Sequence, residues 1–311
     1  MSSDYIPRLR AELVRAAEQQ RSGRRLRRLV PPLRPLIAAA AVALVVVAVL
    51  VAFDGGSGGS DEFEYTVGSG GGEQAAEVMR ERLSAAGLGD ASVSVGSDGR
   101  LAIDAPPESR AAVAALTQPG EFAIYDWETS VLGPDGRPAP GDQTVTGGPN
   151  AGVPHAATSK AQAEVRAAAA PDGARIVRAL DIAAERWYAL GGEPALTSDD
   201  IASAEPVVDR ASNEPAVAIE LTERGQTAFH TLTRGIAQRG ADVRDFQHLV
   251  LVVDDRIVAV PFIDYRQAPD GIDGAGGAQI TGGLTTETAR WMAAMLDSGP
   301  LPAELLPAPD G

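Results

Sequence analysis

Hydrophobic and polar positions follow two periods in this chain, and together they predict an α+β fold after residue 61. Residues 62–67 (EFEYTV) alternate, which is typical of a strand with one buried face. Residues 73–86 (EQAAEVMRERLSAA) instead repeat their apolar side chains every three or four positions, which predicts an amphipathic helix. Gly87 follows it and can supply the left-handed residue that commonly ends a helix.

The following residues continue this pattern with shorter elements. We expect strands at 92–96 and 100–105 around a Ser-Asp-Gly turn, a helix opened by the proline pair 106–107, and a strand at 121–127. The predicted order is then βαββαβ over residues 62–127. This is the order of a ferredoxin-like domain, in which two helices cover one face of a four-stranded sheet. We call this predicted domain the base.

The C-terminal third predicts a second α+β unit. Residues 205–210 and 215–221 have the composition of strands. Thr222 is placed to cap a helix with one apolar side, and Gly240 is placed to end it. We therefore expect a strand pair followed by a helix of about five turns.

A hairpin and a final helix complete this unit. Residues 248–253 and 256–263 are rich in β-branched side chains on both sides of an Asp-Asp turn, which predicts central strands buried on both faces. The segment AQITGG then leads to a helix capped by Thr285 and stopped by a Gly-Pro pair at 299–300.

We assign residues 128–303 to this second unit, the head, and residues 304–311 to a tail. The first part of the head, 128–195, is rich in Gly, Pro and Ala and is a poorly defined insertion. Within it, residues 158–170 predict a helix, whereas 174–192 fit either a strand pair or one helix.

Three segments precede the base. Residues 1–34 contain nine arginines and three acidic residues, a charge of +6, and residues 35–53 contain no charge. Nineteen residues of helix span roughly 28 Å at 1.5 Å per residue, close to the hydrocarbon thickness of a bilayer. We therefore expect a transmembrane helix at 35–53, a basic cytoplasmic segment before it and a Gly/Ser linker at 54–61.

The competing interpretation of residues 35–53 is a cleaved signal peptide. Its apolar core would be longer than the roughly 7–15 residues usual for such peptides, so an uncleaved anchor is preferred. The positive-inside rule then places the base and head outside the cytoplasm of a single-pass membrane protein. The whole chain has a net charge of −15, so the residues after position 34 carry a charge of −21. This negative charge would repel phosphates and disfavours nucleic acid as a partner.

Composition excludes several chemistries. The chain has no cysteine and only one lysine, Lys160, which stands in neither a phosphate-binding loop nor a pyridoxal site. The histidines are His155, His230 and His248, and no two have the spacing of a zinc helix. We expect no cofactor and no bound metal, and we do not expect an enzyme.

Five segments resemble the SecD family of protein-translocase subunits, in its first large extracytoplasmic domain. They are residues 73–88, 196–201, 215–233, 249–263 and 276–305. The last is the most specific, with a Gly-rich approach, a Gln-Ile-Thr-Gly strand, a Thr-initiated helix and a closing Gly-Pro-Leu-Pro. The resemblance implies a base and a head that bind exported polypeptides or the protein translocon.

The chain also departs from that family. SecD proteins continue into further membrane helices that carry proton flow, whereas this sequence has no second apolar span before Gly311. The family's Asp-Leu-x-Gly-Gly signature after the first membrane helix is replaced by a Gly/Ser tether. We therefore expect no proton-driven motor in this chain.

Candidate contacts for a polypeptide are the aromatic residues Phe262, Trp291 and Tyr265. Packing inside the protein is the competing interpretation, because aromatic side chains bury large areas. An exposed sheet edge is the binding mode that this architecture most readily permits.

Aspartates could alternatively hold calcium, at Asp270 and Asp273, or serve a hydrolase, at Asp199-Asp200, Asp254-Asp255 and Asp264. Calcium-loop spacing is missing, and we expect these acids to cap turns. The preferred function is thus an anchored polypeptide-binding domain that assists export or envelope assembly. The alternative is a transmembrane signal relay or anti-sigma-like regulator that acts through residues 1–34.

Overall fold

The computed structural model describes residues 61–68, 71–139, 156–170, 172–180, 185–210, 212–281 and 284–308. The predicted cytoplasmic segment 1–34, the predicted span 35–53 and nearly all of the linker 54–61 lie outside these ranges. Within the described ranges, no helix combines the length and the hydropathy of a membrane span. All described residues belong to one compact unit of the chain.

The base contains a four-stranded antiparallel sheet in the order β14-β1-β3-β2. Its strands are β1 (Asp61–Val67), β2 (Ser92–Val95), β3 (Arg100–Ala105) and β14 (Leu305–Pro307). Its helices are α2 (Gly72–Ala85), the 3-10 turn η1 (Pro107–Ser109) and α3 (Arg110–Leu116). α2 ends at Ala85, and Gly87, two residues later, has the left-handed φ of 83° that the sequence predicts. The base core forms where α2 and α3 bury apolar side chains against β1 and β3.

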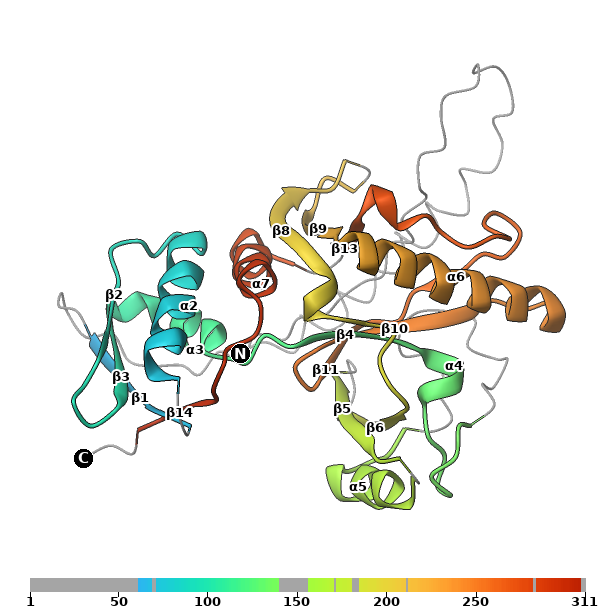
Figure 1. The fold of residues 1–311 in the computed structure, drawn as a ribbon, viewed down its shortest axis with the longest axis horizontal. Coiled ribbons are helices and arrows are strands. Elements are labelled where there is room, and N and C mark those ends of the chain that lie inside the picture. Colours follow the sequence, from blue (N-terminus) through green and yellow to red (C-terminus); the bar gives the residue numbers. More distant parts are fainter. Residues whose placement is uncertain are drawn as a thin grey trace, which may run out of the picture. The chain divides into compact units, whose positions relative to one another are not determined.

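The fourth strand of the base is not the one that the sequence predicts. Residues 121–127 were expected to complete the sheet, but β4 (Phe122–Asp126) pairs with β10 and β7 in another sheet. The first four residues of β4 are all buried, which suits a strand covered on both faces. The base sheet is completed instead by β14, from the segment predicted to be a tail, which lies beside β1 (Figure 1).

The head contains a seven-stranded mixed sheet in the order β6-β5-β11-β10-β4-β7, with β12 paired to β10. Its other strands are β5 (Ala174–Leu180), β6 (Glu185–Gly191), β7 (Leu196–Thr197), β10 (Gln247–Val253), β11 (Arg256–Ala259) and β12 (Phe262–Ile263). β5 and β6 form an antiparallel hairpin, so the strand pair is the correct choice for this part of the insertion. β10 is central and almost wholly buried, as its β-branched composition predicts.

A second head sheet has three antiparallel strands in the order β13-β9-β8. They are β8 (Ile201–Val208), β9 (Pro215–Leu221) and β13 (Ala278–Thr281). The head helices are α4 (Trp127–Ser130), α5 (Lys160–Ala169), α6 (Glu223–Val243) and α7 (Thr286–Ser298), with short turns η2 (Ser198–Asp200) and η3 (Gly274–Gly276). The Thr222 and Thr285 side chains accept hydrogen bonds from the first turns of α6 and α7, so both predicted N-caps are confirmed.

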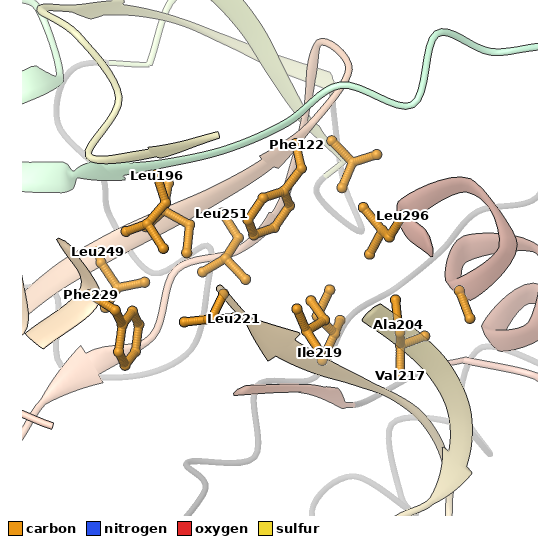
Figure 2. Close-up of a cluster of buried hydrophobic side chains, with 14 of the residues drawn as sticks. Phe122, Leu196, Ala204, Val217, Ile219, Leu221, Phe229, Leu249, Leu251 and Leu296 are labelled. Carbon is orange, nitrogen blue, oxygen red and sulfur yellow. The ribbon is translucent and has the colours of Figure 1, made fainter. Parts of the chain in front are cut away.

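The main head core joins the two sheets to α6 and α7. Figure 2 shows its apolar side chains converging from β4, β7, β9, β10 and the helices. Phe122 and Leu251 come from the larger sheet, Ile219 from the smaller one, and Phe229 from α6. The structure is therefore α+β, as predicted.

Helix α7 belongs to both cores. Ala289, Ala293 and Leu296 are buried in the head core. Ala294, on another side of the same helix, is buried in the base core, and Trp291 packs against that core as well. One helix thus contributes apolar surface to both hydrophobic clusters.

Gly240 does not end α6, contrary to the sequence prediction. The helix continues to Val243, and Arg244 follows with a φ of 59°. A Cβ at Gly240 would lie 2.9 Å from the Asp245 carbonyl oxygen and 3.2 Å from a ring carbon of Tyr265. Glycine stands here because another part of the chain approaches the helix closely, and not because the helix stops.

Candidate functional site

Three aromatic rings and one arginine gather where β12 meets the start of β10. The ring centroids of Phe246 and Phe262 are 4.8 Å apart, and those of Phe246 and Tyr265 are 6.1 Å apart. The Arg266 guanidinium carbon lies 5.6 Å from the Phe246 centroid and 5.2 Å from the Tyr265 centroid. We call Phe246, Phe262, Tyr265 and Arg266 the aromatic patch. Phe262 is 42% exposed, which is unusual for so large an apolar side chain.

The patch adjoins a strand edge. Within the described part of the chain, β12 pairs with β10 only, through the register pairs Gln247 with Ile263 and His248 with Phe262. Alternate residues of a strand face opposite sides of the sheet. Ile263 is therefore buried in the head core, while Phe262 faces outward beside the second edge of β12, which pairs with no strand of the described residues.

The turn after β12 is held by Asp264. Its carboxylate accepts a hydrogen bond from the Arg266 backbone N–H at 2.9 Å and one from the Gln267 side chain at 2.7 Å. The Asp264 carbonyl oxygen accepts a further bond from the Ala268 N–H. These bonds fix the segment that carries Tyr265 and Arg266, so two members of the patch have a defined backbone position.

Beside the patch, charged side chains fix the start of β10. The Glu128 carboxylate accepts hydrogen bonds from the His248 backbone N–H, at 2.9 Å and 3.0 Å, and lies 2.7 Å from the ring Nδ1 of the same residue. Arg239 from α6 donates to both oxygens of Asp126, at 2.7 Å and 2.8 Å, and to Gln247 at 3.2 Å. Burial raises the pKa of Asp126, and the hydrogen bond from Arg239 opposes that shift.

Of the three residues predicted to contact a polypeptide, the structure brings two together. Phe262 and Tyr265 both contact Phe246. Trp291 lies elsewhere, on α7, where it is partly buried against the base core. Its placement follows the competing interpretation of packing between structural units.

The acidic residues considered for a hydrolase or a calcium site have local structural partners. Asp200 and Thr197 form a capping box at η2, and Asp254 accepts two backbone N–H bonds. Asp273 caps η3. In the described ranges, no three histidine or acidic side chains are grouped so that they could hold a metal ion.

Two members of the patch were not singled out from the sequence. Phe246 and Arg266 are far apart until β10 and β12 pair, and a bulge between Leu251 and Val252 shifts the register of the hairpin. The aromatic residues on both sides of the predicted hairpin are the signal that would have indicated them.

The region that contains the patch matches a known family model. Residues 174–303 match the SecDF P1 head subdomain. The match covers β5 to α7 and includes all four residues of the aromatic patch, so the resemblance to SecD that the sequence indicates is confirmed for this subdomain.

Two proteins that are similar to part of this chain carry the name protein translocase subunit SecD. One, from Calditerrivibrio nitroreducens, is 31% identical over 116 residues, which are 37% of this chain and 20% of the relative. The other, from Synechocystis sp., is 28% identical over 141 residues, which are 44% of this chain and 28% of the relative. The chain therefore matches less than a third of the length of either protein.

The fold of the base and head together also has a solved counterpart. A crystal structure of SecDF in its super-membrane-facing form superposes with a TM-score of 0.50 at 19% sequence identity. The superposition covers 81% of this chain and 30% of the SecDF chain. At this identity the likeness concerns the fold alone.

Proposed function

We propose that this chain presents a SecD-type base and head outside the cytoplasm, where the head binds extended segments of exported polypeptides. The observation that carries the proposal is the aromatic patch beside the outer edge of β12, within the matched head subdomain. The two SecD relatives bear the name of translocase subunits, which supports a place in protein export.

An extended polypeptide suits this surface for two physical reasons. The outer edge of β12 offers backbone groups that can pair with an added strand, which gives affinity without sequence preference. Phe262 and Tyr265 offer aromatic faces to the side chains of such a strand, and aromatic anchors contribute strongly at interfaces. Arg266 adds a cation that favours acidic or aromatic side chains in the ligand.

The proposed role is non-catalytic contact in export or envelope assembly. The anchor proposed at residues 35–53 would hold the head near the site where polypeptides leave the membrane. The binding surface and the anchor are separate parts of the proposal and can be tested separately.

Site-specific photo-crosslinking tests the binding surface. A photoreactive amino acid at position 262 of the full chain, expressed in cells, should crosslink to secreted precursors or to translocon subunits. The same probe at Val165, which is 68% exposed on α5, is the control for general exposure. Equal crosslinking at both positions, or none at position 262, would contradict the proposal.

A binding measurement gives the contribution of the aromatic patch to affinity. The double substitution Phe262→Ala and Tyr265→Ala should weaken binding of an unfolded, fluorescently labelled precursor about tenfold, since the loss of two aromatic anchors corresponds to at least ~1.4 kcal/mol. Val165→Ala should leave the anisotropy titration unchanged. An unchanged dissociation constant for the double variant would remove the patch from the proposal.

A further inference from the structure

Arg82 is fully buried, with 0% of its surface exposed, and uses every hydrogen-bond donor that it has. A guanidinium group carries five N–H donors. Nε donates to the Ser298 hydroxyl at 3.0 Å. Nη1 donates to the carbonyl oxygens of Leu116 and Gln118, both at 2.6 Å. Nη2 donates to those of Pro119 and Gly299, at 2.9 Å and 2.7 Å.

The five acceptors belong to two segments that are far apart in the sequence. Residues 116–119 lead from α3 in the base to β4 in the head. Residues 298–299 lead from α7 in the head back to β14 in the base. Within the described residues, the chain passes between base and head by these two connections, because β1 to α3 and β14 form the base and β4 to α7 form the head.

Direct bonds also join the two connections to each other and to the head. The Leu301 N–H donates to the Pro119 carbonyl oxygen at 2.8 Å, so that oxygen serves both Leu301 and Arg82. One carboxylate oxygen of Asp254 accepts the N–H groups of Gly120 and Glu121, at 2.7 Å and 3.0 Å. Arg82 is thus at the centre of a network that contains both connections.

The charge of Arg82 is balanced without a directly bonded carboxylate. Three of its acceptors lie at the C-terminal ends of α3 and α7, where helix dipoles favour a cation. Burial lowers the pKa of Arg82 to about 10, and the nearby charge of Asp254 opposes that shift. The Arg82 side chain is therefore still protonated at neutral pH, and a substitution by a neutral residue removes a positive charge from this network.

The first connection approaches the Arg82 guanidinium closely at Gly120. Gly120 has a φ of 80°, and a Cβ at this position would lie 2.5 Å from Nη2 of Arg82. The first connection can approach the guanidinium this closely only because it has a glycine there.

We propose that Arg82 locks the two connections together and so fixes the orientation of the head on the base. The shared helix α7 packs against both cores, and Arg82 adds hydrogen bonds to the two connections at the ends of α3 and α7. Loss of the guanidinium should therefore let α7 shift against the base and widen the range of head orientations, while the base sheet with α2 and α3 stays folded. This lock does not depend on whether the head binds polypeptides.

Distances between spin labels test the lock directly. The chain contains no cysteine, so paired cysteine substitutions give the only labelling sites. Glu77→Cys on α2 with Gln238→Cys on α6 reports the distance between base and head, since both side chains are exposed. Glu77→Cys with Asp104→Cys on β3 reports the base alone. Each pair is measured by pulsed electron resonance in the full chain, purified in detergent.

Two Arg82 variants and one matched control are compared. Arg82→Gln should at least double the width of the base-to-head distance distribution and leave the base-only distribution unchanged. Arg82→Lys keeps the charge and the apolar stem but has three donors, too few for all five acceptors, so a smaller broadening is expected. Arg80→Gln is the control, because Arg80 is exposed on the same helix and donates only to the Val93 carbonyl oxygen, at 3.2 Å, among the described contacts.

Two results would overturn the lock. One is a base-to-head distribution for folded Arg82→Lys that is as narrow as that of the unsubstituted protein. The other is equal broadening of the base-only pair, which would make Arg82 a general stabiliser of the base. Should Arg82→Gln fail to fold, the decision rests on Arg82→Lys and on Ser298→Ala, which removes only the Nε acceptor and should broaden the distribution slightly.

Discussion

The strand β14 gives the sharpest prediction about stability, because a segment expected to be a tail closes the base sheet. Leu305 is 7% exposed and lies in the base core, whereas its neighbour Leu306 is 53% exposed. Buried Leu→Ala substitutions destabilise proteins by ~2–5 kcal/mol. We expect about 2–3 kcal/mol for Leu305→Ala, since a three-residue edge strand can relax around the lost side chain.

The expected loss is local and can be measured by hydrogen exchange. The Gly68 N–H donates to the Glu304 carbonyl oxygen at 3.1 Å, so its protection depends on β14. A loss of 2–3 kcal/mol corresponds to exchange that is about 30 to 150 times faster. Mass spectrometry should show this change in peptides that cover β1, and little change in peptides that cover β4.

The control is Leu306→Ala, on the same strand but exposed, which should change stability by less than ~0.5 kcal/mol. Equal exchange of β1 peptides in both variants would refute the role of β14. Faster exchange of β4 in Leu305→Ala would refute the separation of β4 from the base sheet.

Three further outcomes are expected from urea unfolding of the full chain. Gly120→Ala should destabilise it by ~2 kcal/mol or more, and by more than Gly173→Ala, because both glycines have a φ near 80° but only the first lacks space for a Cβ. Burial raises the pKa of Asp254, so its carboxyl group keeps a proton to a higher pH in the folded than in the unfolded protein. The free energy of unfolding of the unsubstituted protein, relative to that of Asp254→Asn, should therefore rise as the pH falls toward 3.8. A difference between the two free energies that does not change with pH would contradict this. Arg239→Met should lower the free energy of unfolding by ~1.5–3 kcal/mol, because it removes two charged hydrogen bonds to Asp126. Arg234→Met, on the exposed side of α6, should lower it by less than ~0.5 kcal/mol. Similar losses for the two variants would show that the charged hydrogen bonds contribute little to stability.

Periodicity predicted the elements better than their partners. The helices α2, α6 and α7 and the hairpin of β10 and β11 follow from apolar spacing and threonine caps, which are local signals. The sheet to which β4 belongs is decided by long-range pairing. The sequence signal for this pairing was the unbroken apolar run of residues 122–125, which are all buried in the structure. A strand that is covered on one face only would instead alternate apolar and polar side chains.

A glycine near the end of a predicted helix can have more than one structural role, and a single sequence does not distinguish these roles. Gly87 ends a helix, but Gly240 lies inside one because Tyr265 and the Asp245 carbonyl approach it. The same limit applied to the candidate site. Phe262 and Tyr265 were identifiable as aromatic residues at a hairpin end, but Phe246 joins them only through the register of β10 and β12.

The buried Arg82 shows the limit most clearly. Its position in α2 follows the pattern of the apolar face, beside Met79 and Leu83, where an arginine is unexpected. The acceptors that make this burial favourable come from residues 34 to 217 positions away in the sequence. No local pattern can predict such a site.

The position of β14 also has a consequence for synthesis. Tyr65 pairs with Pro307, so β1 can pair with β14 only after about 240 further residues have been synthesised. At roughly 5–20 residues per second, the ribosome needs about 12–50 s to supply it. During that time one edge of β1 is open, and the head can fold before the sheet that flanks it in the sequence is complete. The nascent base is therefore a target for chaperones, and any nonsense mutation before Leu305 leaves its sheet permanently one strand short.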